Sequence, residues 1–120
     1  MIRDLCLFYG VDYEDALNRF LGKEDLYISF LNKFVSQNNF AEIQTALNQG
    51  DGQAVFQAAH NLKGLSANLS LTPLYTALVP FVDSVRDTSD CTEARKLFPP
   101  VAESYTQMLA FVTAISSITP

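Results

Sequence analysis

The chain has 120 residues, 48% of them hydrophobic, and a formal net charge of −5. This length suits one domain that buries about two-thirds of its unfolded surface, and the hydrophobic content argues against a disordered chain. The acidic balance disfavours a nucleic-acid-binding protein, which normally carries a basic patch.

Apolar residues recur at helical spacing along nearly the whole chain, and strand-like alternation is almost absent. A short first helix is predicted over residues 1–9. A second helix is expected to begin after Asp12 as its N-cap, with Asp15 at the reach-back position of a capping box, and to end at Gly22.

A long helix is predicted over residues 24–49, and the polar run 36–39 is expected to break or bend it. The next helix covers residues 52–69, with Asp51 as its cap. After it, Thr72 is predicted as the N-cap of a further helix, which begins at proline, where a missing N–H does no harm.

That further helix spans residues 73–87, and Pro80 inside it should leave the Thr76 carbonyl unpaired and kink the helix. A final helix over 91–118 is expected to be interrupted at Pro99 and Pro100.

Amphipathic helices joined by short turns predict an all-α fold, an antiparallel four-helix bundle with short N-terminal capping helices. The four helices are those over 24–49, 52–69, 73–87 and 91–118, within a single domain over residues 1–120. The expected core residues are Phe30, Phe34, Phe40, Leu47, Leu62, Leu65, Leu69, Leu78, Phe81, Leu109 and Val112.

No apolar run reaches the roughly 18 residues of a membrane-spanning helix, and the N-terminus lacks the apolar region of a secretory signal. We therefore expect a cytoplasmic protein. Cys6 and Cys91 share no short motif, so we interpret them as small, reduced, buried residues. With one histidine and two distant cysteines, no metal site is predicted.

His60, the single histidine, is placed by a helical wheel about 180° from an apolar stripe. Lys63 lies at i+3 and Gly64 at i+4 on the same side. The stripe consists of Val55, Ala58, Leu62, Leu65 and Leu69.

A lone surface histidine on an amphipathic helix usually has no function, but these two neighbours change that interpretation. Glycine inside a helix costs about 1 kcal/mol relative to alanine, and a broken local rule beside a titratable group indicates function. Lysine at i+3 can neutralise phosphoryl oxygens.

The segment Ala59-His60-Asn61-Leu62-Lys63-Gly64-Leu65-Ser66-Ala67-Asn68-Leu69 resembles the signature of histidine-containing phosphotransfer (HPt) domains, roughly A-H-x-L-K-G-x-[SA]-x-x-[LI]-G. Residues 10–13, 16–20 and 26–27 are also similar to the opening segment of that family. The resemblance covers residues 8–87, with Ser70 standing where the family usually has glycine.

The resemblance implies that His60 accepts a phosphoryl group through Nε2 from a receiver-domain aspartate and passes it to another receiver. Lys63 would steady the phosphoryl oxygens, and Gly64 would leave room for the receiver. The partner would supply the Mg²⁺, so this chain binds no cofactor of its own. Receiver domains of response regulators and a hybrid histidine kinase are the implied partners, with no nucleic acid or membrane involved, and we expect a monomer.

The wheel places Phe56 and Ala67 on the face of His60, with Gln53 beside them, as a docking surface for the partner. Equally, Phe56 could be tucked under the neighbouring helix. Ser66 lies at the border of the stripe, where a local hydrogen bond to the backbone is the expected role.

Enzymatic functions find little support, because the chain has no P-loop, no kinase motifs and no strand for a hydrolase nucleophile elbow. We therefore expect a phosphotransfer intermediate rather than an enzyme. Two alternatives stay open: a helical adaptor that is never phosphorylated, and a piece of a larger hybrid kinase. The initial methionine and the absence of a linker-like tail favour a free-standing protein.

Overall fold

The computed structural model describes residues 1–119, and within this range every regular element is a helix. The all-α prediction is therefore confirmed. The helices are α1 (Ile2–Tyr9), α2 (Tyr13–Arg19), α3 (Glu24–Val35), α4 (Asn39–Gln49), α5 (Gly52–Asn68), α6 (Thr72–Ser84) and α7 (Thr92–Ile118).

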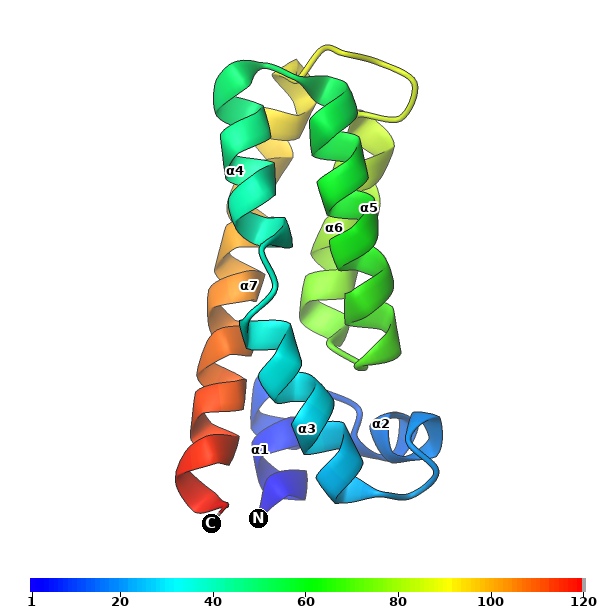
Figure 1. Ribbon diagram of the computed structural model, residues 1–120, viewed down its shortest axis with the longest axis vertical. Coiled ribbons are helices and arrows are strands. Elements are labelled where there is room, and N and C mark those ends of the chain that lie inside the picture. The colour runs from blue at the N-terminus through cyan, green and yellow to red at the C-terminus, as the bar shows by residue number, and fades with distance from the viewer. Residues whose placement is uncertain (120) are drawn as a thin grey trace.

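The helices form an elongated molecule of 44 × 23 × 21 Å, and α7 runs along its whole length (Figure 1). In the upper part, α4, α5, α6 and the first half of α7 alternate in direction as an antiparallel four-helix bundle (Figure 1). In the lower part, α1 and α3 pack against the second half of α7, and both chain ends lie there (Figure 1). Helix α2 lies on the side away from α7, next to α1 and α3 (Figure 1). The predicted bundle with N-terminal capping helices is thus confirmed.

The predicted helix over 24–49 is broken into α3 and α4, as the polar run suggested. The hydroxyl of Ser36 donates to the Lys33 carbonyl at 2.8 Å, which satisfies a group that the helix leaves unpaired at its end. Aromatic rings hold both pieces against α7, because Tyr105 contacts Phe34 of α3 and stacks at 4.1 Å on Phe40 of α4.

Most of the predicted core residues are buried, but Phe30 is not, since 38% of its surface is exposed. The buried residues of α3 are instead Tyr27, Leu31 and Phe34. Phe30 lies at the edge of this buried stripe, where its ring contacts the ring of Phe20. The other members of the predicted set that are only partly buried are Phe40, Leu65 and Leu109.

The expected interruption of the final helix is wrong, because α7 continues through Pro99 and Pro100. Both prolines are exposed, as are Arg95 and Lys96, whose carbonyls lose their helical partners. Solvent can satisfy those carbonyls, while apolar residues on either side of the prolines remain anchored in the core. Burial therefore outweighs the local cost of two prolines.

Asp12 and Asp51 are confirmed as N-caps, since each carboxylate accepts a hydrogen bond from the backbone N–H three residues later. Thr72 is not an N-cap: α6 begins at Thr72 itself, after the fully buried Leu71, and the helix ends at Ser84, earlier than predicted. The helix therefore begins one residue earlier than predicted.

The first residue of α5, Gly52, lies directly against the loop between α6 and α7. A Cβ atom there would stand 2.6 Å from the Thr88 carbonyl oxygen, closer than real contacts allow. The Gln53 side chain also donates to this carbonyl, at 3.3 Å. The loop thereby fixes the end of α5 that leads to His60.

Candidate functional site

His60 lies at the middle of α5 with its side chain exposed to solvent. The buried residues of this helix are Gly52, Val55, Ala58, Ala59, Leu62 and Ser66, and Leu69 just after it is also buried. Ala59 and Ser66 are thus more buried than predicted and Leu65 is less, so the stripe is rotated relative to the prediction. His60 is therefore less directly opposite the buried stripe than the helical wheel suggested.

The imidazole of His60 stacks on the ring of Phe56, one turn earlier, with centroids 5.5 Å apart and planes 13° apart. The guanidinium of Arg86, a residue just after α6, also lies over the Phe56 ring, 5.3 Å from the ring centroid. Phe56 is half-buried and packs against the core. It therefore combines the two alternatives of the sequence analysis, a surface beside His60 and an anchor against the bundle.

Lys63 is half-buried on the same helix, and its ammonium group lies 6.0 Å from the ring centroid of Tyr75 in α6. This contact places the lysine on the side of α5 that borders α6. A cation one turn from His60 is suited to neutralising negative oxygens bound at the imidazole.

Gly64 is exposed in the interior of α5, and a Cβ built on it would meet nothing within 4 Å. The surface beside His60 is therefore low and open. Gln53 is exposed as predicted, whereas Ala67 is half-buried. Ser66 is fully buried, and its hydroxyl donates to the Leu62 carbonyl at 2.8 Å, the local hydrogen bond that was expected.

Two contributors from outside α5, Tyr75 and Arg86, were missed by the sequence analysis. They reach the site because α6 packs against α5, and no local pattern reports which α6 residues face which α5 residues. The assembled site holds the exposed imidazole of His60, the ammonium group of Lys63 one turn away, and the guanidinium of Arg86 over the Phe56 ring. Such a site can present a nucleophilic nitrogen to a partner.

The free cysteines Cys6 and Cys91 are both buried, and burial raises the pKa of the Cys6 thiol to about 11. In residues 1–119, His, Cys, Asp and Glu side chains form no group of three that could hold a metal ion. None of the described helices is both long and apolar enough to cross a membrane.

Comparison with protein families gives a match to the Hpt domain over residues 35–98. Searches of curated proteins and of solved structures give no match. The matched range contains α4, α5 and α6, with His60 and its neighbours, while the similarity noted upstream of residue 35 lies outside it. Because the match covers more than half of the chain and its helical fold agrees, the chain belongs to the Hpt-domain family, which serves phosphotransfer in two-component signalling.

Proposed function

We propose that this chain is a phosphorelay intermediate that accepts a phosphoryl group on His60 from a receiver-domain aspartate and passes it to a second receiver. The observation that carries the proposal is the exposed imidazole of the single histidine, in the middle of the helix at the centre of the family match. Receiver domains and histidine kinases are the classes of partner that membership of this family implies.

In the transfer step, the Nε2 lone pair of His60 attacks the phosphorus of an aspartyl phosphate on the receiver. A nitrogen–phosphorus bond forms, the phosphorus–oxygen bond breaks, and the receiver's aspartate leaves as a carboxylate. The proton that remains on the imidazole balances part of the phosphoryl charge. Reversal of the same step delivers the group to the next receiver.

The residues of this chain position the imidazole and neutralise the charge of the phosphoryl group, and they do not take part in bond making or breaking apart from His60. Stacking on Phe56, which is anchored to the core and covered by Arg86, limits the orientations of the imidazole. Lys63 supplies positive charge for the phosphoryl oxygens, and the open surface at Gly64 admits the partner. The Mg²⁺ that phosphoryl transfer requires would be held by the receiver.

The test is incubation of the chain with a phosphorylated receiver, comparing the parent with His60→Gln. An exposed side chain contributes little to stability, so the variant should fold like the parent, as circular dichroism would verify. The parent should gain an acid-labile, alkali-stable label and the variant none. Labelling of the glutamine variant, or an acid-stable adduct on the parent, would exclude His60.

The alternative function is an adaptor that binds a receiver without taking up phosphate. The same experiment separates the two functions when binding is measured alongside labelling. If the chain is an adaptor, the parent and the His60→Gln variant would bind the receiver equally, and both would remain unlabelled.

A further inference from the structure

A small polar pocket of about 260 Å³ lies where the C-terminal end of α5 meets α2 and the start of α6. Its lining residues are Asp15, Arg19, Ser66, Ala67, Ser70, Thr72 and Tyr75. The pocket combines residues that are far apart in the sequence, and neither the sequence analysis nor the proposed transfer step uses it.

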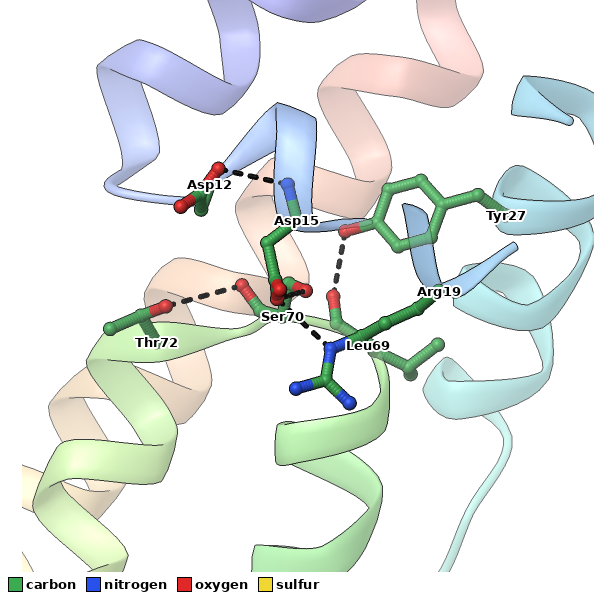
Figure 2. A network of polar contacts seen from close by, with 7 residues as sticks. All are labelled: Asp12, Asp15, Arg19, Tyr27, Leu69, Ser70 and Thr72. Atoms are coloured by element: carbon green, nitrogen blue, oxygen red, sulfur yellow. Dashed lines mark hydrogen bonds and ion pairs between the residues drawn. The ribbon is translucent and has the colours of Figure 1, made fainter. Parts of the chain in front are cut away.

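Asp15 organises this pocket by accepting two hydrogen bonds on one carboxylate oxygen (Figure 2). The Ser70 hydroxyl donates to it at 2.6 Å, and the Arg19 Nε donates at 2.9 Å. These bonds, with that from Ser70 the stronger influence, hold the pKa of the Asp15 carboxyl below its ordinary value. The carboxylate therefore stays ionised and keeps Arg19 in place.

The guanidinium group of Arg19 uses only its Nε in this contact, and its two terminal nitrogens point away from Asp15 (Figure 2). Within residues 1–119, those nitrogens make no hydrogen bond. The side chain is 45% exposed, so a ligand can reach it. A planar pair of N–H donors at a fixed position is the geometry that receives a carboxylate.

The pocket is continuous with the surface around His60. Ala67 lies on α5 about 10 Å along the helix axis from His60. Tyr75 both lines the pocket and contacts Lys63. A transient interface that buries about 600 Å² on each partner spans a radius of roughly 14 Å. A protein domain docked over His60 with this footprint therefore reaches Ala67, which lines the pocket.

We propose that Arg19, positioned by Asp15 and Ser70, binds an Asp or Glu side chain of the docking receiver domain and so contributes to the choice of partner. The inference rests on the proposed function, because the occupant is the receiver that reaches His60. Charge complementarity supports it: the chain is acidic overall, whereas Arg19 directs free donors outward at this one edge of the docking surface.

The test measures the affinity of a receiver domain that phosphorylates the parent chain, using Arg19→Gln, which removes the charge but keeps a long polar side chain. The dissociation constant should rise about five- to tenfold and the salt dependence of binding should weaken. Labelling of His60 by phosphoramidate, a small donor that needs no docking, should be unchanged. Lys96→Ala is the matched control, because Lys96 also forms an ion pair, to Glu93, but lies on α7 outside the pocket.

The partner residue is then identified by a charge swap. Arg19→Glu should bind more weakly than Arg19→Gln, and replacing the correct acidic residue of the receiver by lysine should restore affinity. Parental affinity of Arg19→Gln, an equal loss in Lys96→Ala, or the lack of any rescuing receiver variant would overturn the inference. Failure of the parent itself to accept label from either phosphoramidate or a receiver would instead refute the proposed function.

Discussion

At the scale of single residues, Gly64 lowers the stability of α5 and leaves the surface beside His60 open. A glycine in a helix interior is less favourable than alanine by about 1 kcal/mol, and no neighbouring atom restricts a Cβ at this position. Packing within the chain therefore does not require glycine here. Under the proposed function, glycine here would keep the surface next to the imidazole low for the docking receiver.

Gly64→Ala should accordingly be as stable as the parent or up to about 1 kcal/mol more stable. Gly64→Gln should also fold, but its long side chain would occupy the space that the receiver needs, so transfer to His60 should slow. Melting temperature and transfer rate are measured on the same three proteins. A stable glutamine variant that accepts phosphate at the parental rate would refute the role of Gly64 in docking.

Lys63 is the residue whose charge should matter for the rate. A partly exposed, charge-assisted contact is worth on the order of 1 kcal/mol, so Lys63→Ala should slow transfer about five- to tenfold without unfolding the chain. Lys33→Ala provides the control, because Lys33 likewise lies over an aromatic ring, that of Phe30, but on α3. Equal rates for Lys63→Ala and the parent would remove Lys63 from the site.

At the scale of the helix, α5 contains a second glycine whose role is the opposite of that of Gly64. Gly52→Ala gains helix propensity but forces a Cβ into the backbone at Thr88 and Ser89. Overpacking of this kind costs about 1–3 kcal/mol, which exceeds the propensity gain. The variant should therefore be less stable than the parent in urea denaturation, whereas Gly64→Ala is not. A Gly52→Ala protein with unchanged stability would show that the loop yields freely.

Helix boundaries were predictable where a local chemical signal sets them. The caps at Asp12 and Asp51 and the break between α3 and α4 were found from residue type alone. Which face of each helix is buried was harder to predict from the sequence, because it depends on the neighbouring helix. Phe30 and Leu65 were placed in the core for this reason, and the continuity of α7 through its prolines was missed.

Ser70 illustrates how a departure from a family pattern is accommodated. Its φ of 57° lies in the left-handed region that favours glycine, the residue at this position in the HPt signature that the segment resembles. The hydroxyl gives serine a contact that glycine lacks, the hydrogen bond to Asp15 of α2. The sequence could indicate the unusual backbone position, but only the packing of α2 reveals this contact.

At the scale of the whole molecule, the N-terminal helices are joined to the C-terminal end of α5, the helix that carries His60. The fully buried Tyr27 of α3 donates its hydroxyl to the Leu69 carbonyl at 2.8 Å, next to the contact between Asp15 and Ser70 (Figure 2). At the other end of α5, the loop after α6 packs on Gly52. His60 therefore lies on a helix that is held at both ends, which suits the docking of a receiver that we propose.

The measurement that tests the central claim most directly is nuclear magnetic resonance of the imidazole nitrogens during incubation with a phosphorylated receiver. The chain has one histidine, so the spectrum contains a single imidazole that needs no assignment. The account predicts that its Nε2 signal shifts and couples to phosphorus as the receiver loses its phosphate. An imidazole that stays unchanged while the receiver is dephosphorylated or remains bound would contradict it.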